Sequence, residues 1–483
     1  MAIMVHEQSL PRTASRTRYQ LALWFDPLAC LLIGALAAVW AFTMGGQIGP
    51  WINDYRYLDL WFQGDSPRAF ANMTNLLNNP WSRDDLHPLF RVVTYPLTAA
   101  VAWIFALSLE QAVRVVVSGV AGLWAASFYG LLRLMRLPRL EAMIFSFVLL
   151  TSAAFVFWSG LPETFLFGSL SLIMSMALLA AAEWRRTSPG LYVLNNLLTV
   201  GFVPTSALAG VATTFLRYSF KKALGVLAVS AAALFAFWHV HKAFFPVDRA
   251  SSQDFFLDQA VGPLQILTSL FLHTLVMPEI KLITSSNFTP DYLWRMTTQF
   301  SDPGSGGLLS LVAVVAWVGL MLLGIWSVIT LRASLKLRLL LAIVGLGFLG
   351  AHLMFGDETF LYSLQFAPLL VMLAAFSALG PLRRWSLALA VVFVLSAGIH
   401  NLSQFQHASE FVRGHQSSKH PVAVWPQGAT YVELVHAPSR EHEKALVPPL
   451  DPTMRRERVL PVNYRIRVAL GAFKRDVLTR LGR

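Results

Sequence analysis

The stretch LALWFDPLACLLIGALAAVWAFTMGG, residues 21–46, decides the class of fold. It holds one charged residue, Asp26, and it exceeds the roughly 20 apolar residues that a helix needs to cross a bilayer. The run is longer than a signal-peptide core and no clear small-residue cleavage site follows it, so it predicts a first transmembrane helix. We expect Asp26 to lie at the membrane surface or at the helix start, with a role inside the membrane as the alternative.

The whole chain shares this apolar character. Of its 483 residues, 55% are hydrophobic and 13% are charged, and its mean hydropathy is +0.55. Soluble domains carry about a quarter charged residues, so this composition excludes a disordered chain, a fibrous repeat and an ordinary cytosolic enzyme. The net charge of +12 is better explained by cytoplasmic basic loops than by a nucleic-acid partner. The single cysteine, Cys30, excludes a disulfide framework and a cysteine-based metal site.

Further apolar runs of spanning or near-spanning length follow the first. They cover 89–108, 111–132, 140–159, 163–182, 190–215, 223–245, 307–331, 339–355, 359–381 and 385–400. The segment 260–278 is also apolar, but Pro263, His273 and Pro278 leave open whether it spans or lies at the interface. We therefore expect an all-α polytopic transmembrane bundle of about 10 to 13 spans within residues 1–400. The polar tail 401–483 should lie outside, ending in an amphipathic helix.

Basic clusters between these runs predict the orientation. They hold 16 cations and mark the cytoplasmic side, together with the N-terminus: Arg12, Arg16, Arg18, Arg133, Arg136, Arg139, Arg185, Arg186, Arg217, Lys221, Lys222, Arg332, Lys336, Arg338, Arg383 and Arg384. The connections at 159–163 and 356–358 carry no Lys or Arg and should be extracytoplasmic, as should the long segments 47–88 and 246–305. This pattern indicates an integral membrane protein, most simply of a bacterial inner membrane.

The number of apolar runs does not agree with the number of membrane crossings that this orientation requires. The region 89–132 contains two helix-length runs, although an odd number of crossings must join the outer segment 47–88 to the basic cluster that follows. About 30 residues, 187–216, join two basic clusters, which is enough for two short helices around Asn195–Asn196 and Pro204 but not for two full spans. One segment is therefore expected to be juxtamembrane or re-entrant.

Candidate chemistry gathers in the first outer segment. It reads GPWINDYRYLDL at 49–60, and DDLHPLF follows at 84–90. Residues 47–88 contain five carboxylates and three arginines, interleaved with aromatic residues, which is typical of a segment packed on a membrane surface. A carboxylate there can serve as a general base, and a cation can stabilise a leaving phosphate. The alternative is that each acidic residue only solvates a loop.

This arrangement resembles the GT-C superfamily of integral-membrane glycosyltransferases, which use polyprenyl-phosphate-linked sugars. Asp54 occupies the position of the family's catalytic Asp after the first helix, and 84–90 resembles its second acidic element before a His-Pro-Pro-Leu-like helix start. Residues 159–165 resemble a later outer connection, and 360–368 a late helix start of bacterial members. The sequence departs from the pattern in two ways, because a single proline follows His87 and because Asp59 competes with Asp54.

The resemblance implies an inverting transfer on the outer face, with site residues carried over by position. Asp54 is the expected base and Asp85 the second catalytic carboxylate, while Asp84, Asp85 or Glu163 would orient the acceptor or tune the base. We assign the remaining substrate contacts to Asp59, Asp84, His87, Glu163, Arg249, Glu358 and Tyr362. For Glu358 the alternative is a helix cap, and for Arg249 an ordinary loop residue.

The implied partners are a polyprenyl-phosphate-linked sugar, a glycan, lipid or protein acceptor, and the bilayer. The sequence requires no cofactor and predicts no metal site, because His239 and His241 are two apart and do not share a helix face. A divalent-metal requirement stays open. The alternative functions are a transporter or flippase of a lipid-linked sugar, and a polymerase or ligase of surface polysaccharide.

Overall fold

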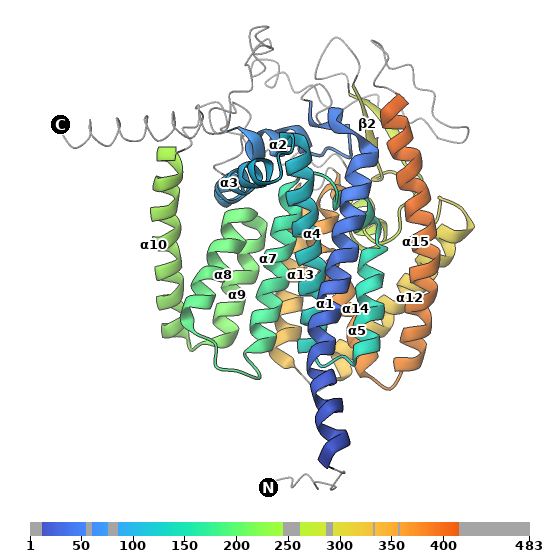
Figure 1. Ribbon diagram of the computed structural model, residues 1–483. Coiled ribbons are helices and arrows are strands. Elements are labelled where there is room, and N and C mark those ends of the chain that lie inside the picture. The colour runs from blue at the N-terminus through green and yellow to red at the C-terminus, as the bar shows by residue number, and fades with distance from the viewer. Residues whose placement is uncertain are drawn as a thin grey trace, which may run out of the picture.

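The computed structural model describes residues 12–54, 60–75, 86–244, 261–285, 293–331, 334–355 and 358–414. Figure 1 shows a bundle of helices with two distinct ends. We call one the basic end, where α4 (Leu109–Leu134) finishes and α5 (Arg139–Leu150) begins. We call the other the hairpin end, where α1 (Arg12–Ile48) finishes beside α2 (Ser66–Thr74) and a β-hairpin.

Eight helical stretches in the described ranges are long and apolar enough to cross a membrane. They lie in α1, α4, α7 (Thr164–Ala181), α10 (Phe220–Phe244), α12 (Leu308–Thr330), α13 (Leu335–Phe355), the stretch made by η6 (Thr359–Tyr362), α14 (Ser363–Ala375) and η7 (Phe376–Leu379), and α15 (Arg383–Gly414). The chain is therefore an all-α integral membrane protein with many spans. The number of long helices is smaller than the expected 10 to 13 spans, because three apolar runs fold into shorter helices.

The first of these is α3 (Pro88–Ile104), which was expected to span. Figure 1 shows α3 beside α2 at the hairpin end, and it also packs against α4 and α8 (Pro189–Phe202). Its 17 residues reach only about 25 Å, less than the hydrocarbon thickness of about 30 Å. Because α3 stays at one end, a single crossing by α4 joins the hairpin end to the basic end, and the crossing count closes.

The run 140–159 is broken between α5 and α6 (Ala153–Trp158). Ser152 caps α6, and the amides of Ala153 and Ala154 donate to the carbonyls of Leu275 and Thr274 at 3.0 and 2.9 Å. These acceptors follow α11 (Pro263–Thr268) and the π-helical turn η5 (Ser269–His273). The segment 260–278 therefore does not span, and it satisfies the exposed amides of the broken helix.

The run 190–215 forms two short helices, as predicted. They are α8 and α9 (Ala207–Arg217), separated by the turn η3 (Pro204–Ser206). Ser175 donates to the Asn195 amide oxygen at 2.9 Å, and the Asn196 amide donates to Thr214 at 3.3 Å. These hydrogen bonds join α7, α8 and α9 inside the bundle, where few other partners for polar side chains exist.

Two features of the structure were not expected from the sequence. Strands β1 (Lys281–Ser285) and β2 (Leu293–Thr297) form an antiparallel hairpin within the segment 246–305. The last helix, α15, continues past the expected domain boundary at 400 and ends at Gly414. Its continuation keeps a buried stripe at Asn401, Phe405, Ala408 and Val412, so packing extends the helix past the end of the apolar run.

The position of α3 predicts the result of a labelling experiment. In a Cys30→Ser background, single cysteines at Asn75 and Glu110, both exposed and flanking α3, should react with a membrane-impermeant maleimide from the same side. A cysteine at Ser188, beyond the next crossings, should react from the opposite side. Labelling of Asn75 and Glu110 positions from opposite sides would show that α3 crosses the membrane.

Candidate functional site

The described candidate residues all lie in segments that pack together at the hairpin end. Asp54 follows α1 through the short turn η1 (Pro50–Asn53), and it is partly buried. Ile48 and Ile52 are almost fully buried and fix the backbone on both sides of this turn. η1 packs against α2, so the backbone that leads to Asp54 is held against the protein.

Glu163 reaches the same end through a close approach of two glycines. A Cβ at Gly160 would lie 2.5 Å from the Gly45 nitrogen and 2.6 Å from the Ala41 carbonyl oxygen. Only glycine therefore permits the turn at 159–163 to rest on the last turns of α1. Glu163 is 2% exposed and occupies the N-cap of α7, where its carboxylate accepts from the Thr164 amide at 3.3 Å. A carboxylate at the N-terminus of a helix also interacts favourably with the helix dipole.

Five buried aromatic residues hold these segments together. We call them the aromatic anchor: Trp61, Phe62, Phe157, Trp158 and Phe360, each no more than 1% exposed. Trp61 donates from its indole nitrogen to the Phe157 carbonyl at 3.2 Å, and Trp158 donates to the Phe360 carbonyl at 3.1 Å. The rings of Phe62 and Phe360 meet edge to face at 5.1 Å between centroids. The anchor thus joins the segment after Asp54 to α6 and η6.

The backbone at this anchor is strained. Phe62 and Gln63 have φ values of 48° and 61°, in the left-handed region that costs a non-glycine residue about 1–2 kcal/mol. Full burial of an aromatic side chain contributes about 1.5–3 kcal/mol, and an aromatic pair adds about 0.5–1.5 kcal/mol. Burial of Trp61 and Phe62 therefore outweighs the strain and fixes the path of the first segment.

Glu358 binds the hairpin. Its carboxylate accepts from the Thr298 hydroxyl at 3.1 Å and from the Thr297 hydroxyl, and it is 3% exposed. Glu358 occupies the N-cap position of η6 but makes no capping hydrogen bond, and Gln299 instead accepts from the Thr359 amide at 2.9 Å. Glu358 therefore does not cap the helix through its side chain, because its carboxylate accepts from Thr297 and Thr298 instead.

Tyr362, four residues after Glu358, lies between α7 and α13. Its ring contacts Phe165 at 4.9 Å and His352 at 5.1 Å between centroids. Phe165 is two residues after Glu163, so Tyr362 connects η6 to the start of α7. The Nε2 atom of His352 is buried without a hydrogen-bond partner among the described residues. The His352 ring can therefore form a hydrogen bond with a ligand that reaches it.

His87 lies on the other flank of α7. Its Nδ1 atom hydrogen-bonds the Phe202 carbonyl oxygen at 2.6 Å, at the end of α8. Phe167 contacts both Phe90 and Phe202, at 5.2 and 5.4 Å between ring centroids. The start of α3, the end of α8 and the first turns of α7 therefore meet, which places His87 near the helix that Glu163 caps.

Four of the expected site residues, Asp59, Asp84, Asp85 and Arg249, lie outside the described residues, as does the tail after 414. Sequence reasoning missed two buried arginines at the hairpin end. Arg68 is 8% exposed and pairs with Asp65 at 2.7 Å, and Arg91 is 1% exposed and donates to the Asn75 carbonyl at 2.8 Å. Arg91 was signalled as a basic residue inside the apolar run 89–108, whereas Arg68 was one of the three arginines of the segment 47–88.

His273 was also missed. It lies in the π-helical turn η5, which packs against η6, and neither ring nitrogen has a hydrogen-bond partner among the described residues. Burial lowers the pKa of His273 to about 3, so the ring is neutral at pH 7. π-helical turns are frequent at functional sites, which adds His273 to the candidates. No group of three or more metal-binding side chains occurs in the part of the chain that the structure describes.

No protein-family model, curated protein or solved structure matches the chain. Its class, an all-α integral membrane protein, therefore rests on its own helices.

Removal of a buried aromatic side chain should loosen the hairpin end. Trp61→Ala should lower the free energy of unfolding by about 3–5 kcal/mol, because it leaves a cavity in the aromatic anchor and removes the bond to Phe157. Thermal unfolding in detergent measures the effect. Trp326→Ala is the matched control, since Trp326 is 57% exposed. Equal melting temperatures for the two variants would contradict the anchor.

The contact of Glu358 with the hairpin predicts a local effect. Glu358→Ala removes the acceptor of two buried threonine hydroxyls and should cost about 1–3 kcal/mol, with faster amide exchange in β2. Glu358→Gln keeps one acceptor oxygen and should lose less. The control is Glu410→Gln, which changes an exposed carboxylate on α15. Unchanged amide exchange in β2 of Glu358→Ala would contradict a stabilising contact between Glu358 and the hairpin.

Proposed function

We propose that the protein is a GT-C-like glycosyltransferase, which moves a sugar from a polyprenyl-phosphate donor to an acceptor at the hairpin end. The observation that carries the proposal is the place of Asp54. This partly buried carboxylate follows the first membrane-crossing helix, at the end that also holds Glu163, Glu358 and Tyr362. In this proposal the hairpin end faces away from the cytoplasm and the membrane is a bacterial inner membrane.

Asp54 has the chemistry of a general base. It takes the proton of an acceptor hydroxyl while the oxygen forms a bond to the anomeric carbon of the sugar. The bond from that carbon to the phosphate oxygen breaks on the opposite face, and its electron pair leaves with the phosphate. The product is an inverted glycoside and a polyprenyl phosphate. Because the lipid stays in the bilayer, the reaction must occur at an end of the bundle.

The leaving phosphate requires cations. Arg68 in α2 and Arg91 in α3 are candidates, because α2 packs against η1, which precedes Asp54, and α3 packs against α2. Arginine in a low-dielectric site stabilises the charge that develops on a departing phosphate. Asp65 pairs with Arg68 and holds its guanidinium in place. Glu163 and Tyr362 are the proposed groups for orienting the acceptor.

A direct test uses purified protein with a labelled polyprenyl-phosphate hexose and follows the release of polyprenyl phosphate. Asp54→Asn keeps the shape of the side chain but cannot accept the proton, so the rate should fall about 10²- to 10⁴-fold. Asp302→Asn changes an exposed carboxylate outside the proposed site and should leave the rate unchanged. The melting temperature of Asp54→Asn should match that of the natural chain.

Full activity in Asp54→Asn would remove the assigned base. Movement of the labelled lipid across liposomes without a new glycosidic bond would instead establish the transporter alternative. A polymerase or ligase of surface polysaccharide would release the same lipid product but would require a glycan acceptor.

A further inference from the structure

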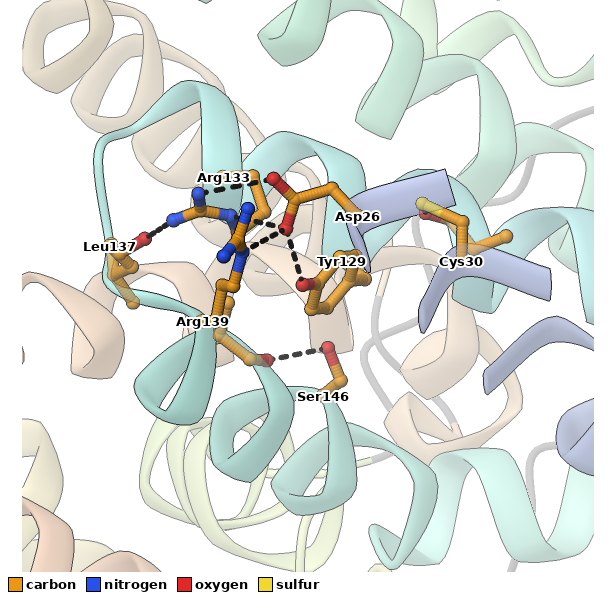
Figure 2. A network of polar contacts seen from close by, with 9 residues as sticks. Asp26, Cys30, Tyr129, Arg133, Leu137, Arg139 and Ser146 are labelled. Carbon is orange, nitrogen blue, oxygen red and sulfur yellow. Dashed lines mark hydrogen bonds and ion pairs between the residues drawn. The ribbon is translucent and has the colours of Figure 1, made fainter. Parts of the chain in front are cut away.

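A charged cluster at the basic end has no part in the proposed transfer. The Asp26 carboxylate of α1 accepts hydrogen bonds from the Tyr129 hydroxyl at 2.9 Å and from Arg133 at 3.0 and 3.2 Å, both in α4. Arg139 at the start of α5 adds a bond at 3.2 Å. Figure 2 shows the two arginine side chains converging on Asp26. Asp26 lies at the beginning of the apolar stretch Phe25–Ile48 and not at the start of α1, which begins at Arg12, and its carboxylate joins three helices.

This cluster carries excess positive charge. Arg133 and Arg139 both pair with the Asp26 carboxylate, and Arg136, between them in sequence, stacks on the exposed Trp184 at 4.2 Å. Glu141, the next carboxylate along α5, is fully buried and pairs with Arg383 instead. The side chains of Arg139 and Asp26 are 36% and 34% exposed, so the cluster is accessible from its surroundings. An anion that approaches this point meets a positive field.

An apolar groove of about 250 Å³ begins beside this charged cluster, at Phe25. It runs between α1 and α5 and is lined by Phe25, Leu28, Ala29, Leu32, Ile33, Leu36, Met143 and Phe147. The Arg139 guanidinium lies over the Phe25 ring at 4.8 Å, so the groove and the cluster are continuous. The distance along α1 from Phe25 to Leu36 is about 16 Å, roughly half the hydrocarbon thickness of about 30 Å.

We propose that this groove binds an anionic phospholipid of the leaflet at the basic end. One acyl chain lies along α1 and α5 to the middle of the bilayer, and the phosphate group meets Arg139 beside Phe25. Charge complementarity favours an anionic over a zwitterionic lipid, because each nearby arginine raises the affinity for an anionic headgroup about five-fold. The apolar lining and its one-leaflet length favour a membrane lipid over a soluble anion.

The experiment measures lipid retained by the detergent-purified protein in native mass spectrometry, with melting temperature as a second readout. Phosphatidylglycerol and phosphatidylcholine with identical acyl chains are compared. We expect phosphatidylglycerol to be retained preferentially and to raise the melting temperature, and Arg139→Gln to weaken its retention about five-fold. Arg384→Gln removes an exposed arginine at the same end but away from the groove and should retain the natural preference.

A second pair of variants tests the groove without touching the charges. Leu32→Trp fills the groove and should abolish the preference, whereas Leu31→Trp adds the same bulk to a neighbouring exposed position that does not line the groove. Both residues are largely exposed, at 62% and 70%, so neither change disturbs the core. Equal retention of the two lipids, full retention in Leu32→Trp, or equal stabilisation by inorganic phosphate would overturn the proposal.

Discussion

Burial of Trp61 and Phe62 between α6 and η6 is the interaction on which the hairpin end depends. The chain leaves α1 at Ile48 and turns at Gly49, whose φ is 92°, into η1, but this short turn alone does not hold the following segment against the bundle. The two aromatic side chains hold it there, because they find partners about 100 and 300 residues away in sequence, at Phe157 and Phe360. The backbone accepts left-handed conformations at Phe62 and Gln63 to make these contacts. Asp54 is positioned as a consequence.

The membrane imposes the second constraint, that each backbone polar group within the bilayer must find a partner. It explains why the broken helix α5–α6 is accompanied by the turn after η5, whose carbonyls accept from the exposed amides. It also explains the polar bonds that join α7, α8 and α9 around a similar break. Short helices are tolerated here because other parts of the chain complete their hydrogen bonding.

Apolar runs and basic clusters were sufficient to predict the class of fold, the break near Pro204 and the existence of one segment that does not cross. They did not identify that segment as α3, since its composition matches that of a span, and its short helix and its packing against α2 and α8 are what distinguish it. The hairpin, the contact of Glu358 with Thr297 and Thr298, and the burial of Arg91 depend on partners distant in sequence. Periodicity carries no information about such pairs.

We propose that Asp54 faces the reacting sugar of a lipid-linked donor at the hairpin end. A structure of the protein with a bound polyprenyl-phosphate hexose tests it most directly. The account predicts the anomeric carbon beside Asp54, the phosphate against Arg68 or Arg91, and the lipid chain between helices. A donor bound at the basic end, or Asp54 turned away from the sugar, would contradict it.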